Sequence, residues 1–95
     1  MFIVELTYLK PLDAIEAKLE AHRHFLDAQY LNGVFLASGP KIPRDGGVIL
    51  ASGRISRSDL NTILAHDPFQ LHGLASYRAT EFSPVKAHPA LIGIL

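Results

Sequence analysis

The chain has 95 residues, of which nine are Lys or Arg and nine are Asp or Glu, and it contains no cysteine. Because the charges cancel, no positive field attracts a phosphate backbone or an anionic membrane, and neither nucleic-acid nor membrane binding is expected. The missing cysteines exclude disulfides and thiolate chemistry. No apolar run approaches the roughly 20 residues of a membrane span, and no export signal is recognised. We therefore expect a single cytoplasmic domain over residues 1–95.

Four segments have the composition of β-strands. They are rich in β-branched, aliphatic or aromatic residues and are bounded by Gly, Pro or Asn. The strands are predicted over residues 2–9, 34–38, 47–55 and 75–82. The second and third strands are separated by a loop with two prolines, which predicts a hairpin.

Two helices are predicted between these strands. The first begins at Pro11, keeps an apolar period of 3.6 residues to Tyr30 and ends at Asn32-Gly33. The second is capped by Ser56 and stops at Asp67-Pro68, since a residue before proline avoids the helical conformation. The order strand, helix, strand, strand, helix, strand predicts an α+β, ferredoxin-like βαββαβ fold, with both helices on one face of a four-stranded antiparallel sheet.

The other face of this sheet needs a cover. The strand over residues 2–9 is largely apolar on both faces, and the strand over residues 47–55 shares this property. A second copy of the chain is the simplest cover, so we expect a homodimer. The C-terminal extension over residues 83–95 ends in an apolar run from Ala90 to Leu95, which either adds to this association or forms a mobile tail.

His22 lies in the apolar stripe of the first predicted helix. With about 100° per residue, it shares a face with Ile15, Leu19 and Leu26, whereas His24 points the opposite way. An imidazole in such a stripe either finds a hydrogen-bond partner in the core or lies beside a cavity that holds water or a ligand. From the helix alone, a satisfied core histidine is the commoner outcome.

Asp67 is the predicted partner of His22. If both helices start at the same edge of the sheet and run parallel, each residue lies about 15 Å along its helix, and the two side chains meet. A carboxylate bonded to one ring nitrogen fixes the tautomer and makes the other nitrogen a better general base. Asp67 has an equally common alternative role, as a helix-stop residue that binds nearby backbone amides.

Further residues are candidates for the wall of a ligand pocket. Gly39 allows close approach of a ligand, and the neighbouring Ser38 offers a hydroxyl. The predicted substrate-binding residues are Tyr8, Ser38, Gly39, Pro40 and Phe69. Lys41 and Arg44 could attract an anionic substrate. The alternatives are a plain strand-to-turn transition, core aromatics and solvated loop charges.

No cofactor or metal is expected. The chain has neither a glycine-rich phosphate loop nor a dinucleotide fingerprint. His66, Asp67 and His72 do not match a recognised metal spacing. Residues 48–55 lack the aromatic side chains on which RNA bases stack in modules of this fold.

The sequence resembles the YciI-like, or YCII-related, family of small dimeric α+β barrel proteins, up to about Phe82. The motifs that carry the resemblance are His22-Arg23-His24-Phe25-Leu26, Leu31-Asn32-Gly33, Ala37-Ser38-Gly39-Pro40, Asp67-Pro68-Phe69 and Gly73-Leu74. The resemblance implies a ferredoxin-like protomer, a homodimer and an active site with His22 and Asp67. One member of this family is a dehydrochlorinase of chlorinated aromatic breakdown. Many members have an arginine where this chain has Leu19, so an anion contact from that position does not carry over.

Two hypotheses about function follow. In the first, the chain is a cofactor-independent enzyme of lyase, isomerase or dehydrochlorinase type, in which His22, oriented by Asp67, moves a proton on a small, cyclic or aromatic substrate. In the second, it is a non-catalytic module for ligand binding or interaction, and the same pair only stiffens the contact between helices. A pocket open to solvent beside His22 favours the first, and apolar packing over its free nitrogen favours the second.

Overall fold

Four strands form one antiparallel sheet in the computed structural model, which describes residues 1–95. The strands are β1 (Phe2–Tyr8), β2 (Phe35–Pro40), β3 (Gly46–Ala51) and β4 (Ala75–Glu81), in the spatial order β2-β3-β1-β4. β1 lies in the centre, where Phe2 is opposite Ala51 of β3 and Glu81 of β4. This order confirms the predicted ferredoxin-like βαββαβ fold. β3 is shorter than expected, because the chain leaves the sheet in a turn after Ser52.

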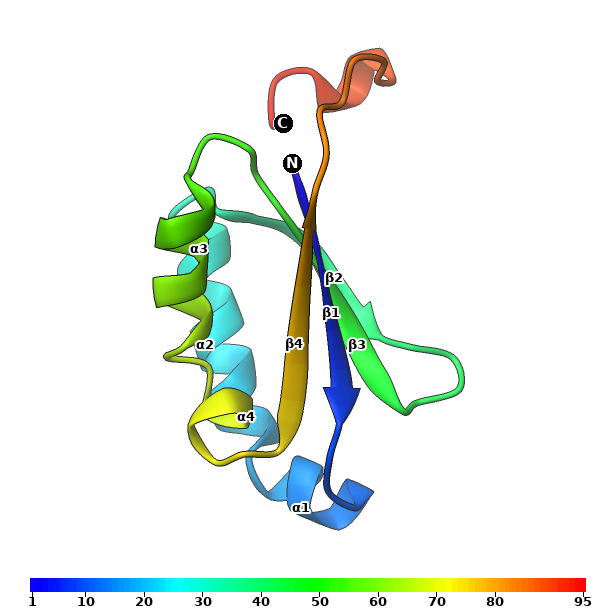
Figure 1. The fold of residues 1–95 in the computed structure, drawn as a ribbon, viewed down its shortest axis with the longest axis vertical. Helices are drawn as coiled ribbons and strands as arrows, with labels where there is room; N and C mark the ends of the chain where they lie inside the picture. Colours follow the sequence, from blue (N-terminus) through cyan, green and yellow to red (C-terminus); the bar gives the residue numbers. More distant parts are fainter.

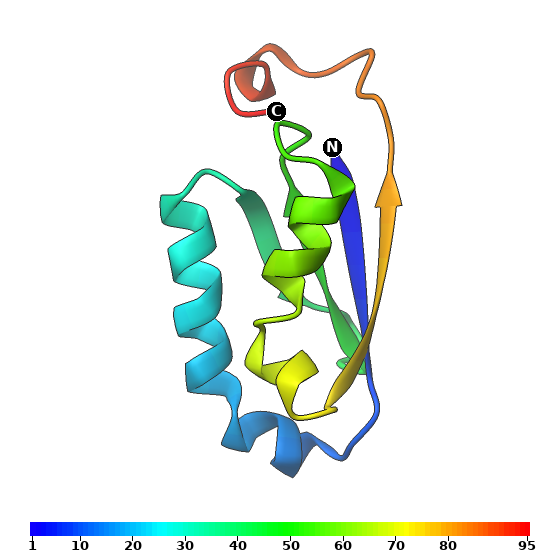
Figure 2. The same ribbon diagram turned by 60° about the vertical axis from the view of Figure 1, so that its left-hand side comes forward.

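The helices that follow β1 and β3 leave one side of the sheet uncovered (Figures 1 and 2). They are α1 (Leu12–Ala17), α2 (Leu19–Leu31), α3 (Arg57–Leu64) and α4 (Pro68–Leu71). Ser56 caps α3 as predicted, since its hydroxyl accepts the amide of Asp59 at 3.0 Å. None of these helices has the length and apolar character required to cross a bilayer.

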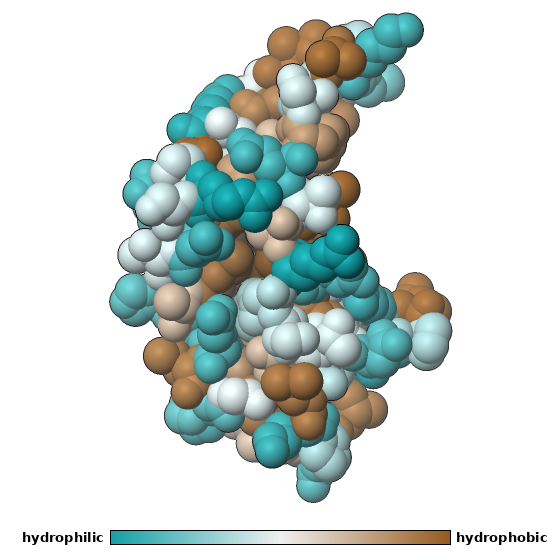
Figure 3. Space-filling view, viewed as in Figure 1, coloured by the Kyte–Doolittle hydropathy of each residue, from teal (hydrophilic) through white to brown (hydrophobic).

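Alternation along β1 separates the two faces of the sheet. Phe2, Val4 and Leu6 are buried beneath the helices, whereas Ile3 and Glu5 point to the opposite face and are exposed. The core therefore lies between the helices and one face of the sheet. The opposite face is uncovered, and the space-filling view is hollowed on that side (Figure 3).

The first predicted helix is broken. A single helix from Pro11 to Tyr30 was expected, but Lys18 leaves the helical conformation with φ −114° and ψ 6° and separates α1 from α2. Neither Gly nor Pro marks this position, so the apolar period does not reveal it. The break lets α1 lie across the end of the sheet while α2 runs along its face (Figure 1). His22 is thus close to the start of α2.

The two long helices run antiparallel, and the expectation that they run parallel was wrong. β1 and β3 are antiparallel neighbours, so the helices that follow them start at opposite ends of the sheet. α2 runs upward in Figure 1, and α3 runs downward beside it. The beginning of α2 consequently lies next to the end of α3, which is where His22 and Asp67 are placed.

The segment after β4 folds back over one end of the sheet (Figure 1). It contains a short 3-10 helix, Pro89–Leu91, and Arg54 donates hydrogen bonds to the carbonyl groups of Gly93 at 2.9 Å and Leu95 at 3.0 Å. Several of its apolar side chains, including Val85 and Ile92, are exposed. In the space-filling view, hydrophobic surface is visible at the upper end of the molecule, where this segment lies (Figure 3).

Candidate functional site

Asp67 is positioned by the short connection between α3 and β4. It caps the N-terminus of α4, where Pro68 occupies the first helical position, and its Oδ1 accepts the amide of Phe69 at 3.0 Å. The carboxylate is completely buried, with 0% of the residue exposed. The alternative interpretation of Asp67, a residue that binds nearby backbone amides, therefore describes one of its contacts.

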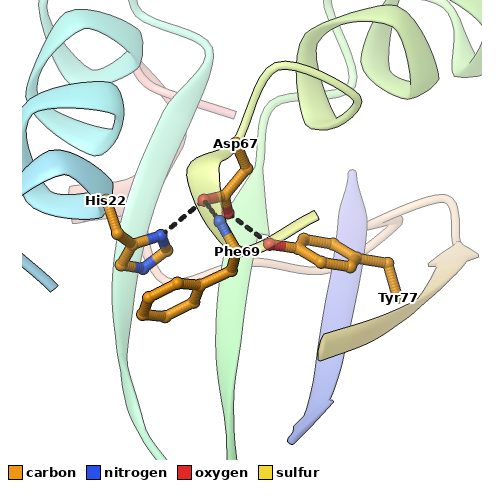
Figure 4. A network of polar contacts seen from close by, with 4 residues as sticks. All are labelled: His22, Asp67, Phe69 and Tyr77. Atoms are coloured by element: carbon orange, nitrogen blue, oxygen red, sulfur yellow. Dashed lines mark hydrogen bonds and ion pairs between the residues drawn. The ribbon is translucent and has the colours of Figure 1, made fainter. Parts of the chain in front are cut away.

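The second contact of Oδ1 is with His22. The Nδ1 of His22 lies 2.8 Å from Oδ1 of Asp67, and Figure 4 shows the carboxylate between this ring and a tyrosine from β4. Because a carboxylate accepts hydrogen bonds, Nδ1 carries the proton and donates a hydrogen bond to Asp67. This leaves Nε2 as the nitrogen that is free to accept a proton.

Tyr77 completes the set of donors around Asp67, and its role was not recognised from the sequence. Its hydroxyl donates a hydrogen bond to Oδ2 of Asp67. Burial, followed by the charge of Asp67, raises the pKa of the Tyr77 phenol well above its ordinary value. One signal was available, since Tyr77 lies two residues from both Ala75 and Ala79 on β4 and so shares their inward-facing side of the strand. Three donors now offset the cost of burying the carboxylate.

Replacing Tyr77 with phenylalanine is expected to lower the free energy of unfolding by about 1–2 kcal/mol at neutral pH, because Oδ2 of Asp67 loses its donor. The pKa of Tyr77 is higher in the folded protein than in the unfolded chain. Its hydrogen bond therefore contributes fully to the free energy of unfolding below about pH 10, and this contribution is lost as the pH rises above that value. The stability difference between wild type and Tyr77→Phe should shrink at alkaline pH. Urea unfolding of both proteins from about pH 8 to about pH 11 measures it, and a constant difference contradicts the assignment.

The His22 ring is fixed from a second direction by Phe69. The two rings are stacked, with centroids 3.9 Å apart and planes inclined by 7°. Every fully buried side-chain nitrogen or oxygen in the protein has a hydrogen-bond partner. Nε2 of His22 has no hydrogen-bond partner, so it is not one of the fully buried atoms. Nε2 is therefore accessible, and it points away from Asp67 (Figure 4).

His22 is one of the residues that line a pocket of about 410 Å³ between α2 and the sheet. Its lining includes all the substrate-binding residues predicted from the sequence, which are Tyr8, Ser38, Gly39, Pro40 and Phe69. Ser38 is held there by a hydrogen bond of 2.5 Å between its hydroxyl and that of Tyr30. The volume lies within the range of small-molecule sites.

Only one of the two cationic residues proposed from the sequence lines the pocket. Arg44 lines the pocket, whereas Lys41 forms an ion pair with Glu5 at 2.7 Å and does not line it. Arg23 lines the pocket as well and was not recognised as a candidate. Its position next to His22 on an exposed helix edge was the available signal. His24 is exposed, as the helix phase predicts, and no group of three His, Asp or Glu side chains converges as metal ligands would.

Fold and site together define a ferredoxin-like α+β protein with a buried His–Asp pair beside a pocket. The model of the YCII-related domain matches residues 1–83. The chain therefore belongs to the YCII-related domain family, and residues 84–95 lie beyond the matched region.

Comparison with solved structures agrees with this assignment of the fold. One similar structure is 5-chloro-2-hydroxyhydroquinone dehydrochlorinase from Burkholderia phenoliruptrix AC1100, in complex with 2,5-dihydroxybenzoquinone. Its TM-score is 0.70 at 17% sequence identity, and the alignment covers 87% of this chain and 94% of that chain. No curated protein matches the sequence.

Proposed function

We propose that this protein is a small enzyme that works without a cofactor and uses His22, held by Asp67, to move a proton on a small cyclic or aromatic substrate. The observation that carries the proposal is the bond of 2.8 Å from Nδ1 of His22 to a fully buried carboxylate, with the accessible Nε2 at the pocket. A base in this arrangement is held in one orientation and one tautomer before the substrate binds.

The chemistry follows from the roles of the two residues. Nε2 accepts a proton from a carbon or hydroxyl of the substrate, and the electron pair left behind either shifts within the substrate or expels a leaving group from the adjacent atom. In the first outcome, Nε2 returns the proton to another atom of the substrate and completes an isomerisation, whereas the second outcome is an elimination. In both, the imidazolium that forms is stabilised by the carboxylate of Asp67. The dehydrochlorinase with the same fold supports a reaction of the second kind.

The rival function is a ligand-binding or interaction module in which the pair is only structural. The stacking of Phe69 on the His22 ring, at 3.9 Å, is the observation in its favour, since it stiffens the contact between α2 and α4. A purely structural imidazole is best placed with both nitrogens satisfied inside the protein. The accessible Nε2 beside a pocket therefore favours the enzyme.

Deuterium incorporation tests the proposed function without knowledge of the complete reaction. Wild type and His22→Ala are incubated in heavy water with a panel of hydroxyquinones, chlorinated hydroquinones and cyclic ketones, and proton NMR follows the loss of substrate C–H signals. We expect wild type to accelerate exchange or elimination on at least one compound, and His22→Ala to lose this acceleration. Equal rates with both proteins contradict the proposal.

We further propose that the protein is a homodimer that pairs the uncovered faces of two sheets. Ile3 is 40% exposed on this face, and Leu50 lies directly opposite it on β3. An apolar strip in the middle of an uncovered sheet is an unfavourable solvent contact, and a second copy removes it. A stable interface of this kind buries at least about 1,000 Å².

Leu50→Lys is expected to convert the dimer to a monomer, because two lysines brought into an apolar interface lose hydration without gaining a partner. Leu31→Lys is the matched control, since Leu31 is 89% exposed at the end of α2, among the helices rather than on the sheet. Analytical ultracentrifugation of the three proteins measures the change. A monomeric wild type at micromolar concentration, or equal behaviour of both variants, contradicts the homodimer.

A further inference from the structure

We propose that the pocket beside His22 takes a small organic acid, whose carboxylate lies between Arg23 and Arg44 and whose apolar body lies against the inner wall. This inference rests on the proposed function for the location of the site, and it adds the chemical class of the ligand.

The first observation is the charge of the lining. Arg23 and Arg44 both line the pocket, and no Asp or Glu does. The chain as a whole has no net charge, with nine basic and nine acidic residues. Cationic side chains are therefore concentrated at this pocket, and the field within it favours an anion.

The second observation is that both arginines have donors to spare. Arg44 lies in the loop between β2 and β3 and bonds Oε1 of Glu16 through one amino group at 3.1 Å. This contact fixes the guanidinium near the pocket and leaves other donors available. The neighbouring hydroxyl of Tyr8 and the carboxylate of Glu16 raise the pKa of Arg44, so its charge is retained. Arg23 forms no ion pair with any residue of the chain.

The third observation is the chemistry of the remaining wall. Leu6, Leu19, Leu26 and Ile49 line the pocket together with the ring of Phe69. A guanidinium binds a carboxylate through two parallel hydrogen bonds, whereas such a wall offers only apolar contact. The arrangement suits a molecule with one charged end and a ring or short aliphatic body, and His22 lines the same pocket.

Benzoate, phenylacetate and cyclohexanecarboxylate are the probes, each paired with its uncharged amide of nearly the same shape. Binding is followed by NMR of the ¹⁵N-labelled protein, through the amides of Gly39 and Gly47, which line the pocket. We expect at least one carboxylate to shift these amides and its neutral partner to bind about tenfold or more weakly. Raising the ionic strength should weaken the binding of the carboxylate. No shift with any carboxylate, or equal affinity for acid and amide, overturns the inference.

Three variants locate the charge that selects the ligand. Arg23→Gln and Arg44→Gln are each expected to weaken carboxylate binding by about 3- to 10-fold. Lys86→Gln removes the same charge from the exposed C-terminal segment and should leave binding unchanged. An effect of Lys86→Gln as large as that of either arginine variant means that net charge, rather than this pocket, governs binding, and contradicts the inference.

His22→Ala separates this inference from the proposed function. Because the arginines hold the carboxylate of the ligand, the His22→Ala protein should still bind the ligand. Adding Arg23→Gln to this variant should still weaken that binding. If carboxylates bind in this way but His22→Ala leaves the rate of proton transfer unchanged, the ligand class stands and the catalytic proposal fails. If proton transfer depends on His22 but acids and amides bind alike, the catalytic proposal stands and the ligand class fails.

Discussion

His22→Ala is expected to lower the turnover of any substrate of this protein by about 10²–10⁴-fold, which is the usual contribution of a positioned general base. The expected loss is large because Nε2 is the only accessible ring nitrogen of the buried pair, with Nδ1 committed to Asp67 at 2.8 Å. The effect should fall on kcat, since the proton is transferred after the substrate has bound. Steady-state kinetics on the compound found by deuterium exchange measures it.

His24→Ala is the matched control for this experiment. His24 lies two residues further along α2 and is exposed, so its removal should change neither turnover nor stability by a measurable amount. Circular dichroism and thermal unfolding of both variants establish that each is folded. A folded His22→Ala protein with unchanged turnover rules out the catalytic role of His22.

Asp67→Ala is expected to cause the largest loss of stability of any single substitution at the site. The side chain accepts hydrogen bonds from His22, from the amide of Phe69 and from Tyr77, and all three donors lose their partner together. Removing a buried, hydrogen-bonded carboxylate in this way lowers the free energy of unfolding by about 3–5 kcal/mol. For a chain of this length, the melting temperature should fall by about 15 °C or more. Thermal and urea unfolding measure the effect.

Asp67→Asn separates the structural role of this residue from its chemical role. The amide has nearly the same shape, and its oxygen still accepts from His22 and from the Phe69 amide, so most of the stability should remain. Its neutral side chain cannot stabilise the imidazolium, and turnover should fall although the protein is folded. An Asp67→Asn protein with full turnover contradicts the role of the carboxylate in catalysis.

The fold was predictable because each element carries its own local signal. The strand character of β1, the Ser56 cap and the stop at Asp67-Pro68 are all read from neighbouring residues. His22 was assigned to the inner face for a similar reason, since Leu19, His22 and Leu26 keep helical spacing within α2 alone. This assignment was therefore unaffected by the break at Lys18.

The geometry of the pair was predicted for a wrong reason. Two parallel helices were expected to place His22 and Asp67 at equal distances along their axes. In the structure the helices are antiparallel, and the residues meet because one lies near the start of α2 and the other just beyond the end of α3. The helix directions follow from the antiparallel pairing of β1 with β3, which is a tertiary property.

Tyr77 and Arg23 were missed because their roles depend on tertiary neighbours. Nothing in the order of residues states that the β4 phenol reaches the carboxylate that precedes α4, although a buried carboxylate requires more donors than one imidazole supplies. In the sequence, Arg23 has the character of a solvated helix residue. Its role depends on the β2–β3 hairpin, which places Arg44 at the same pocket.

The tautomer of His22 tests the central claim most directly, because it is measured on the wild-type protein and requires no substrate. Long-range ¹H–¹⁵N correlation spectra of the labelled protein distinguish protonated from unprotonated ring nitrogens, and the spectrum of His22→Ala assigns the His22 signals among the five histidines. The bond to Asp67 predicts that the neutral ring carries its proton on Nδ1 and presents an unprotonated Nε2 to the pocket. A neutral ring with its proton on Nε2 would contradict the assignment of His22 as a general base.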